Sequence, residues 1–412
     1  MHRMATNSGA RAVDNWFVFL MLWVLPTLSF LLAFIASIIF AGNLPQFTRW
    51  RGGQLSPEDE QPAVSVLIPA RDEEAGIRQS VQSVLDNAGV TLEVVVLDDG
   101  STDATADIVR SMSDEDPRVR LLDGIDLPDG WNGKQHACYR LSHAAQYDLF
   151  LFLDADVRLT PTALQQLARR QAQSIQSANR LETPISLLSA FPHQETGTLL
   201  EKLLIPMMHY ILLCYLPFSR MRSSVHPAYA SGCGQLFFTD RDSYGRSGTH
   251  EAIRATRHDG LRLPMIYREQ GMLTDCVDGS GLATCRMYTG PTAVVRGLLK
   301  NASEGIANPR LLLPFTVLLG GASVLPYFLL AYALTRQPDA ATPLAIGYAI
   351  LLSLAAIFLS HLPRWVAARK FRQSVIGALL HPLSIAIFLL LQWIAFFNHL
   401  TGKQIAWRGR ST

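Results

Sequence analysis

The chain has 412 residues, which is enough for one large domain or two ordinary ones. Its formal net charge is only +2, so the sequence lacks the basic excess that is typical of nucleic-acid-binding proteins. Hydrophobic residues make up 49% of the chain and the mean hydropathy is +0.17, which is high for a soluble protein of this size. The apolar excess lies at the two ends of the chain, and this distribution predicts a membrane protein with a soluble middle.

The first apolar stretch covers residues 16–41 and contains no charged residue. A helix needs about 20 apolar residues to cross the hydrocarbon core of a bilayer. The stretch is too long for the apolar part of a signal peptide, and no convincing cleavage site follows it. Residues 1–45 are therefore predicted to form an N-terminal membrane anchor that the mature protein retains.

Three further apolar stretches lie near the C-terminus, at about 310–334, 342–361 and 374–398. Their length and scarcity of charge favour transmembrane helices over the alternative of buried core helices. Residues 310–400 are therefore predicted to form a C-terminal membrane region, preceded by a juxtamembrane helix at 291–309.

Basic residues beside the spans indicate the orientation of the chain, because cytoplasmic loops carry an excess of Lys and Arg. The 362–373 connection carries Arg364, Arg369, Lys370 and Arg372. This predicts a multi-pass protein of the cell (inner) membrane with its middle domain in the cytoplasm. The basic tail at 401–412 conflicts with this orientation, since three later crossings would place it outside. Either the last span is a kinked hairpin near His381 and Pro382, or the tail breaks the rule.

The five cysteines of the chain show no C-x-x-C pair and no metal-binding spacing. They are Cys138, Cys214, Cys233, Cys276 and Cys285. A cytoplasmic domain keeps its thiols reduced, and an odd number of cysteines argues against a disulfide framework. The cysteines are predicted to be free thiols that are mostly buried.

Short apolar runs alternate with amphipathic ones in the middle domain, which is predicted to cover residues 60–290. Strands are expected at 63–70, 92–103 (running into a turn), 118–122 and 147–156, and helices at 73–87, after 103 and at about 134–146. Strands that alternate with helices imply β-α-β units with right-handed crossovers, and hence a mostly parallel sheet. The predicted fold class is therefore α/β, with transmembrane α-helices at both ends of the chain.

Three polar clusters follow predicted strands of this domain. They are Arg71-Asp72-Glu73-Glu74, Asp98-Asp99-Gly100-Ser101 and the pair Asp154 and Asp156. Ligands of open α/β sheets bind beyond the carboxyl ends of the strands, so the three clusters are expected to meet in one site. This convergence is more informative than any single motif.

The sequence FLFLDAD places Asp154 and Asp156 directly after an apolar strand. Alternate residues of a strand point to the same side, so the two carboxylates are expected to share a face. Like charges that are held together cost free energy unless a cation lies between them. Oxygen ligands suit a hard cation, and the pattern predicts Mg²⁺ or Mn²⁺ carried by a diphosphate ligand. The alternative is a surface loop, since so short a motif also occurs by chance.

Two further motifs have a structural as well as a functional interpretation. In VLDDGSTD, an aspartate at the strand end could accept hydrogen bonds from a base or a ribose, or the following residues could cap a helix. In GWNGKQHAC, Lys134 opens a predicted helix and could reach phosphates or the metal-site carboxylates, or stay solvated. The spacing of a Walker loop is absent from this segment.

Four segments, VSVLIPARDEE, VVVLDDGSTD, GKQHACYRL and LFLDAD, follow one another in an order and spacing that resemble family 2 glycosyltransferases of the GT-A fold. The resemblance extends over about residues 63–290. It implies a Rossmann-like GT-A domain that uses a nucleotide-sugar donor and a divalent metal. The membrane layout is similar to that of bacterial transferases that act on carotenoid or hopanoid-type lipids.

The resemblance also implies roles for individual residues. Asp156 would hold the metal, Asp154 would assist the sugar or the ribose, and Lys134 would meet the diphosphate or the metal-site carboxylates. Asp99, in preference to Asp98, would contact the uracil base or the ribose. The other residues expected to flank the nucleotide are Pro69, Ala70, Arg71 and Glu73.

The catalytic base of the family is usually the aspartate of a Glu-Asp pair, and in this chain the pair reads His258-Asp259. Asp259 keeps the second position and is implied to be the base, while His258 departs from the family pattern. Glu251 is the second candidate for the base. A structural alternative for Asp259 is the N-cap of the following helix, where Asp is favoured.

A second departure from the family is the absence of the Gln-x-x-Arg-Trp motif of processive polysaccharide synthases. Arg286, Arg296 and Lys300 occupy the neighbouring region. These residues could meet a diphosphate or lipid headgroups, or they could anchor the chain at the membrane interface.

The segment 196–218 is apolar but is interrupted by Glu201, Lys202, Pro206 and Pro217. Crossing a membrane would bury both charges, so the segment is predicted to form an amphipathic helix in the headgroup region. A buried core helix is the alternative. An interfacial helix would bring a lipid hydroxyl group to the site.

Together these features predict an enzyme. The expected reaction is inverting transfer of a sugar from a nucleotide donor, a UDP-sugar by resemblance, to a hydroxyl group of a membrane lipid, without a nucleic-acid partner. In one alternative, the domain binds a nucleotide sugar without turnover and the spans act in lipid-carrier translocation. In another, the chain is a membrane phosphotransferase with the same carboxylate–metal chemistry, although Walker and kinase motifs are absent from the sequence.

Overall fold

The computed structural model describes residues 15–49, 61–178, 184–302, 304–338 and 342–401. The chain divides into two units. The sheet unit contains Asn43–Thr196 and Leu216–Thr289. The helical unit contains the described residues up to Gly42, together with Gly197–Tyr215 and those from Gly290 onward.

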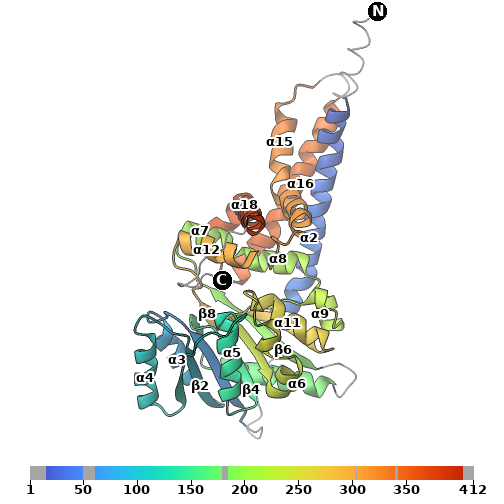
Figure 1. Cartoon of the computed structure of the whole chain (residues 1–412). Coiled ribbons are helices and arrows are strands. Elements are labelled where there is room, and N and C mark those ends of the chain that lie inside the picture. The colour runs from blue at the N-terminus through green and yellow to red at the C-terminus, as the bar shows by residue number, and fades with distance from the viewer. Residues whose placement is uncertain (1–14, 50–60, 179–183, 303, 339–341, 402–412) are drawn as a thin grey trace, which may run out of the picture. The chain divides into compact units, whose positions relative to one another are not determined.

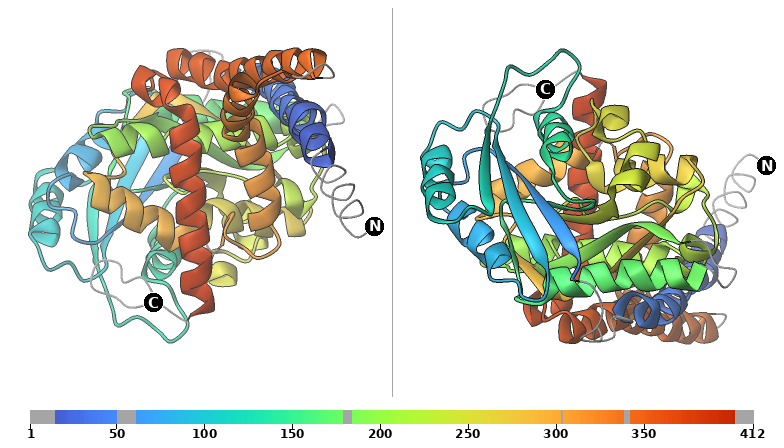
Figure 2. Two further views of the ribbon diagram at one scale, coloured as in Figure 1. Left: turned by 90° about the horizontal axis from the view of Figure 1, so that it is seen from above. Right: turned by 90° about the horizontal axis from the view of Figure 1, so that it is seen from below.

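The sheet unit is built on an eight-stranded sheet with the strand order β3-β2-β1-β4-β7-β6-β8-β5 (Figures 1 and 2). The strands are β1 Ala63–Ala70, β2 Thr91–Asp98, β3 Val119–Asp123, β4 Leu149–Leu153, β5 Val157–Leu159, β6 Ile185–Gln194, β7 Leu236–Asp240 and β8 Leu273–Cys285. β1 is parallel to β2 and β4, and β2 is parallel to β3, whereas β7 is antiparallel to both neighbours. The predicted mostly parallel α/β architecture is therefore confirmed.

The helices of the sheet unit are α3 Ile77–Leu85, α4 Thr105–Glu115, α5 Gly133–Ala144, α6 Ala163–Ala178, α9 Phe218–Ser223, α10 Arg241–Arg246 and α11 Asp259–Glu269, with short 3-10 turns η2 Pro227–Tyr229 and η3 His250–Ile253. α3 begins later than the predicted start of its helix at residue 73. Asp72 has a φ of 52°, and the backbone N–H of Glu73 donates to Thr105 Oγ1 at 2.8 Å. The loop before α3 is therefore tied to the start of α4 instead of continuing the helix.

Apolar side chains on both faces of the sheet form the core of this unit. Val66 and Ile68 of β1 lie in one buried cluster with residues of α3, α4 and α6. Leu67 lies in a second cluster, on the other face, with residues of α5 and α11. Both faces of β1 are buried, as expected for a central parallel strand, and this explains its nearly continuous apolar sequence.

The parallel register brings the ends of three neighbouring strands to one edge of the sheet. Ala70 at the end of β1 lies opposite Asp98 at the end of β2. β4 is the other neighbour of β1, and it ends at Leu153. The polar residues that follow these strands therefore start from the same edge, as the sequence predicts.

The helical unit contains the apolar segments of the chain. Its elements are η1 Leu20–Val24, α2 Leu25–Thr48 (whose last residues belong to the sheet unit), α7 Leu199–Leu204, α8 Met207–Tyr215, α12 Pro291–Ala302, α13 Leu312–Phe315, η4 Thr316–Gly320, α14 Gly321–Ser323, α15 Leu325–Thr335, α16 Pro343–Lys370, α17 Val375–Leu379 and α18 His381–Leu400. Among the described residues, three helices are long and apolar enough to cross a membrane, namely Asn15–Thr48, Pro343–Lys370 and His381–Leu400. Leu312–Ser323 and Leu325–Thr335 also qualify as one span with a bend of 47°.

The predicted single helix at 196–218 is two helices, α7 and α8, followed by the start of α9. The break falls at Pro206, which has no N–H to continue the hydrogen bonds of α7. Within the helical unit, α7 packs against α12, α17 and α18, while α8 packs against α16. The placement of this segment in the headgroup region stays a prediction.

Glu201 in α7 links the two segments by which the chain enters the helical unit, one before α7 and one before α12. Its side chain is 0% exposed, and its carboxylate accepts hydrogen bonds from Gly197 N at 2.6 Å, Thr198 Oγ1 at 2.8 Å and Gly290 N at 2.8 Å. Burial alone would raise the pKa of Glu201, but these hydrogen bonds outweigh it and hold the pKa below its usual value. The carboxylate therefore stabilises the folded helical unit in its ionised form.

Glu201→Gln is expected to lower the stability of the protein in detergent by about 1.5–3 kcal/mol, because the amide cannot accept all three hydrogen bonds. Thermal unfolding of both proteins measures the difference. The difference is present above the ordinary pKa of glutamate and disappears as the pH falls through the lowered pKa of the folded state. Lys202→Gln removes a neighbouring charge but none of these bonds, so an equal loss in that variant would refute the role of Glu201.

Candidate active site

Asp154 and Asp156 lie in the turn between β4 and β5, and not within a strand as predicted. The N–H of Val157 donates to the carbonyl of Asp154 at 3.1 Å and closes the turn. The N–H of Asp154 donates to the carbonyl of Gln235, just before β7, at 3.0 Å. The two carboxylates are thus held near each other by a tight turn at the sheet edge, and strand alternation is not the cause.

Lys134 joins two acidic residues that lie far apart in the sequence. Its Nζ atom lies 2.5 Å from Asp154 Oδ1 and 2.8 Å from Asp259 Oδ2, and it donates to the carbonyl of Gly234 at 3.1 Å. Lys134 is the second residue of α5, and Asn132 Oδ1 accepts from its N–H at 3.1 Å and caps the helix. One cation therefore balances two largely buried carboxylates at the start of α5.

The pKa values of the two carboxyl groups in the cluster are shifted in opposite directions. Burial raises the pKa of Asp154 to about 6, although the positive charge of Lys134 opposes this increase. Burial also acts on Asp259, but the charge and hydrogen bond of Lys134 outweigh it and lower the pKa of this carboxyl. Asp259 is therefore ionised at neutral pH, and a ligand that draws Lys134 away would raise its basicity.

Asp259 is the first residue of α11 and is 9% exposed. The N-cap position belongs to His258, and Asp259 Oδ1 accepts only from the adjacent N–H of Gly260 at 2.8 Å among the hydrogen bonds of its helix start. The predicted capping alternative for Asp259 is therefore wrong. Gly234 leaves room for the carboxylate, because a Cβ at this position would collide with the carboxylate oxygens of Asp259.

Asp156 has the features expected of a metal ligand. Its Oδ1 atom is buried and has no hydrogen-bond partner in the described structure. Burial and the negative charge of Glu73 raise the pKa of Asp156, while the thiol of Cys285 donates to the same carboxylate. An orphaned buried oxygen among acidic neighbours fits a hard divalent cation.

No group of three or more His, Cys, Asp or Glu side chains within the described ranges is arranged to hold a metal ion by itself. A cation at Asp156 would therefore take most of its ligands from a bound diphosphate and from water. Mg²⁺ commonly binds in this way, with one or two carboxylates and substrate phosphates.

Arg71 and Asp99 meet at the ends of β1 and β2. Arg71 Nη1 donates to the carbonyl of Asp99 at 2.9 Å and lies 3.9 Å from its Oδ2 atom. The N–H of Asp99 donates to the carbonyl of Ala70 at 2.8 Å, and Pro69 precedes Ala70 in β1. Asp98 instead accepts from the N–H of Ser101 within its own turn. The structure thus brings together the residues predicted to flank a nucleotide.

The residues after Asp99 connect two loops of the site, and Asp103 also binds the start of α4, where its Oδ1 atom accepts from the N–H of Thr105 at 3.0 Å. Thr102 donates through its N–H to Asp72 Oδ1 at 2.8 Å, and the N–H of Asp72 donates to Ser101 Oγ at 2.9 Å. The N-cap position of α4 is Ala104, which has no side chain that could accept. These hydrogen bonds therefore fix the conformations of the acidic loop after β1 and the loop after β2 relative to each other.

Within the described residues, no ion pair joins Glu251, the second candidate for the base, to Lys134. Glu251 is exposed in η3, and its own N–H donates to Thr249 Oγ1 at 3.2 Å.

Sequence reasoning missed Cys285 and Gln235, which lie beside the acidic turn. Gln235 Nε2 donates a hydrogen bond to Cys285 Sγ at 2.7 Å. The glycine-rich segment SGCGQ was the only signal that the chain approaches a site there.

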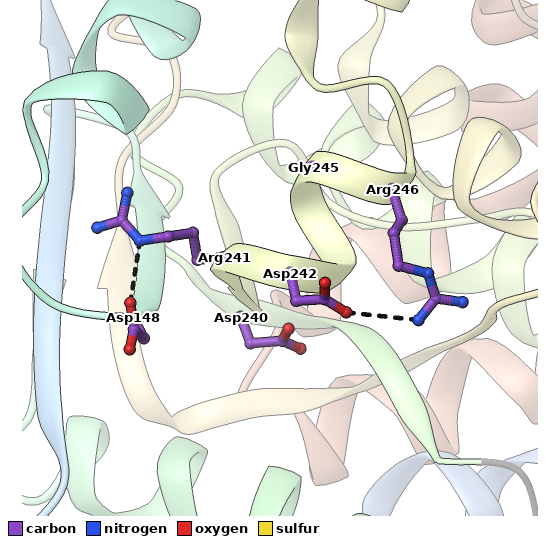
Figure 3. A pocket seen from close by; sticks show the side chains of 6 residues that line it. All are labelled: Asp148, Asp240, Arg241, Asp242, Gly245 and Arg246. Atoms are coloured by element: carbon purple, nitrogen blue, oxygen red, sulfur yellow. Dashed lines mark hydrogen bonds and ion pairs between the residues drawn. The ribbon is translucent and has the colours of Figure 1, made fainter.

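A shallow cavity of about 690 Å³ lies elsewhere in the sheet unit (Figure 3). Its lining residues are Asp148, Asp240, Arg241, Asp242, Gly245 and Arg246. Arg241 pairs with Asp148 at 3.0 Å and Arg246 pairs with Asp242 at 3.5 Å. Asp148 precedes β4, so the cavity is at the opposite end of this strand from Asp154. These two pairs are exposed, and pairs of this kind contribute little energy, while Asp240 accepts from the N–H of Ser243 at 2.8 Å.

Part of the chain is similar to known proteins. Residues 65–180 match the family model described as Glycosyl transferase family 2, and the match includes Lys134, Asp154 and Asp156 but not Asp259. The chain is 28% identical over 253 residues to the 4,4'-diaponeurosporenoate glycosyltransferase of Staphylococcus aureus strain USA300, which covers 60% of this chain and 63% of the relative. The chain thus spans less than two thirds of the length of the curated relatives it matches.

The fold is also similar to that of a solved structure, the mannosyltransferase PcManGT of Pyrobaculum calidifontis in complex with GDP-Man and Mn²⁺. The TM-score is 0.50 and the identity is 16%, over 92% of this chain and 100% of that one. At this identity the likeness concerns the fold alone. The chain therefore carries a family 2 glycosyltransferase domain of the GT-A fold.

Proposed function

We propose that the chain transfers a sugar from a nucleoside diphosphate sugar to a hydroxyl group of a membrane lipid, with inversion at the anomeric carbon. The observation that carries this proposal is the position of Lys134, which contacts both Asp154 of the acidic turn and Asp259 of α11. The family 2 domain and the GT-A fold supply the donor class. The acceptor and the stereochemistry are our extension.

The donor nucleoside is assigned to the ends of β1 and β2. Asp99 would accept hydrogen bonds from the base or the ribose, and Arg71 holds its backbone in place. Pro69, Ala70 and Glu73 complete this side of the site. We expect a UDP-sugar, and we note that the similar mannosyltransferase binds GDP-Man.

Asp156 would hold Mg²⁺ or Mn²⁺, and its unpartnered Oδ1 atom supports this role. Such a cation, when bound, neutralises negative charge that develops on the leaving diphosphate. Lys134 places a second positive charge beside the same carboxylates. The diphosphate would draw Lys134 away from Asp259, so donor binding itself frees the base.

Asp259 would accept the proton of the lipid hydroxyl as the hydroxyl oxygen attacks the anomeric carbon. General-base assistance of this kind needs an ionised carboxylate within hydrogen-bond reach of the acceptor. The bond from the anomeric carbon to the diphosphate breaks in the same displacement, which inverts the centre. The curated relative is named for 4,4'-diaponeurosporenoate, and we extend the acceptor class to membrane lipids.

The apolar helices would hold the chain in the cell membrane, with the sheet unit on the cytoplasmic side, where nucleotide sugars occur. This placement rests on the candidate spans and on the basic 362–373 connection. The proposed partners are the nucleotide-sugar donor and the lipid acceptor.

A donor panel tests the proposal. Purified protein in lipid vesicles is offered UDP- and GDP-sugars with Mn²⁺, with and without a total lipid extract, and the release of nucleoside diphosphate is measured. We expect one donor to be turned over only when both the metal and the extract are present. Donor binding without release from any sugar would favour the alternative of a nucleotide-sugar-binding protein that acts in lipid-carrier translocation.

Lys134→Met is expected to reduce kcat by roughly 10²-fold, because a positive charge beside the diphosphate is lost and two carboxylates are left unbalanced. Lys134→Arg retains the charge and serves as the matched variant, with a smaller loss. Steady-state kinetics with the productive donor measure both. An unchanged kcat in Lys134→Met would show that the lysine has only a structural role.

A further inference from the structure

α18 is one of the three helices with the length and composition of a membrane span, but its direction within the helical unit differs from that of the others. In Figure 1, the axes of α2, α15 and α16 run roughly from the top to the bottom of the picture, whereas α18 is viewed end-on. The view from above in Figure 2 shows α18 at full length, as the red helix in the middle. Helices that cross the same bilayer run roughly along one direction, and α18 lies across the other three.

α18 packs mainly against a short helix that carries charges, and it also contacts η4 and α14 of the bent pair. Its main partner is α12, which contains Arg296 and Lys300, and it also contacts α7, which contains Glu201 and Lys202. Neither of these two helices is long enough to cross a membrane. A span in the hydrocarbon core would instead pack lengthwise against other spans, as α15 packs against α16.

One stripe of α18 is apolar and uncovered. Leu383, Leu390 and Phe397 are 46%, 59% and 55% exposed, and they repeat at intervals of seven residues along one side of the helix. The opposite side is buried, and Gln392 is only 3% exposed there. At its start, His381 Nε2 lies 3.2 Å from Ser323 Oγ and holds the helix against α14. The helix thus has one face for protein and one for an apolar medium.

We propose that α18 lies in the plane of the membrane interface, with its uncovered stripe in the acyl chains of the leaflet on the cytoplasmic side, and does not cross the bilayer. This inference rests on the proposal that α2 and α16 are spans. Lipid is the occupant that fits, because the stripe exposes large apolar side chains, as α16 does at Leu344, Leu351 and Phe358. α18 also contains no Asp, Glu, Lys or Arg in its 20 residues.

The proposal also resolves the conflict in the basic residues. With α2, the bent pair that includes α15, and α16 as the crossings, the chain returns to the cytoplasm at the end of α16. The tail with Lys403, Arg408 and Arg410 lies outside the described residues, but as the continuation of α18 it would then be on the same side as the 362–373 connection. Both basic segments satisfy the positive-inside rule under this arrangement.

Spin-label depth measurements in lipid vesicles test the proposal directly. Single cysteines are introduced into the full chain at positions of the α18 stripe and, as a matched control, at equally spaced lipid-facing positions of α16. The positions are Leu383, Leu390 and Phe397 for α18, and Leu344, Leu351 and Phe358 for α16. The native cysteines are all buried, so the unsubstituted chain measures background labelling.

Seven residues of helix correspond to about 10 Å along the axis. For α16 we therefore expect the label depth to change strongly between the three positions, whereas for α18 we expect three depths that agree within a few ångströms. A progression in α18 like that in α16 would overturn the proposal. Equal depths in α16 as well would show that the helical unit does not cross the bilayer, and the inference would fail with it. Neither depth measurement depends on sugar transfer.

The side of the tail gives an independent result. Lys370→Cys follows the end of α16, and Ser411→Cys lies in the tail. In intact spheroplasts, a membrane-impermeant maleimide is expected to label neither cysteine, and both are labelled after permeabilisation. Labelling of Ser411→Cys alone in intact cells would mean that α18 crosses the membrane.

Discussion

Asp259→Asn is expected to leave donor binding intact and to lower the rate of sugar transfer by about 10²- to 10⁴-fold. The amide has the shape of the carboxylate and can still accept from the N–H of Gly260, but it cannot accept a proton from the acceptor hydroxyl. It also leaves Lys134 paired with Asp154. Transfer rates and donor dissociation constants, measured on the same preparation, separate the chemical step from binding.

Glu251→Gln is the matched control for this prediction, because Glu251 is the other acidic candidate for the base. It is exposed and does not contact the Lys134 cluster in the described structure, so its loss is expected to leave the rate unchanged. A large loss in Glu251→Gln with a normal rate in Asp259→Asn would transfer the role of base to Glu251.

Asp156→Asn is expected to abolish the metal dependence of the reaction and to reduce transfer by about 10³-fold or more, since a bound metal contributes several kcal/mol to catalysis. The amide would remove the charge that attracts a hard cation at the buried Oδ1 position. Mn²⁺ binding in the presence of UDP, followed by electron paramagnetic resonance, gives a readout that does not require turnover.

Asp148→Asn is the control for this second prediction. Asp148 lies at the other end of β4, where it is exposed and pairs with Arg241. Its loss is expected to change neither Mn²⁺ binding nor transfer. If Asp156→Asn bound Mn²⁺ and UDP like the wild type, the assignment of the metal to Asp156 would be wrong.

The proposed donor side of the site could be predicted from the sequence because short-range patterns determine its position. Apolar runs mark β1, β2 and β4, and parallel strands must end at one edge of the sheet. The polar residues after those strands therefore converge, and the contact between Arg71 and Asp99 is one result. The start of α5 at Gly133 likewise follows from the residues before Lys134.

The proposed acceptor side could not be derived in this way, because it depends on packing between distant segments. Lys134 and Asp259 are separated by more than a hundred residues, and no periodicity relates them. Gly234 shows its importance only when the neighbouring carboxylate is seen to occupy the space of a side chain. The turn that holds Asp154 and Asp156 replaces the strand that alternation suggested, since β4 already ends at Leu153.

The direction of α18 could not be predicted from the sequence either. Hydropathy reports the length of an apolar segment and not the direction of its axis, so α18 and α16 give equivalent signals in the sequence. The main partner of α18, the short helix α12, distinguishes the two helices. The positive-inside conflict at the tail was the one sequence signal that something differed there.

The most direct test of the central claim is the incorporation of labelled sugar into extractable lipid. Wild-type protein and Asp259→Asn are incubated in vesicles with the productive labelled donor, Mn²⁺ and the lipid extract, and the label in the organic phase is counted. We predict that the wild type places the label in lipid and that the variant does not, although both bind the donor. Label that stays in water while nucleoside diphosphate is released, or equal incorporation by the variant, would contradict a lipid glycosyltransferase with Asp259 as its base.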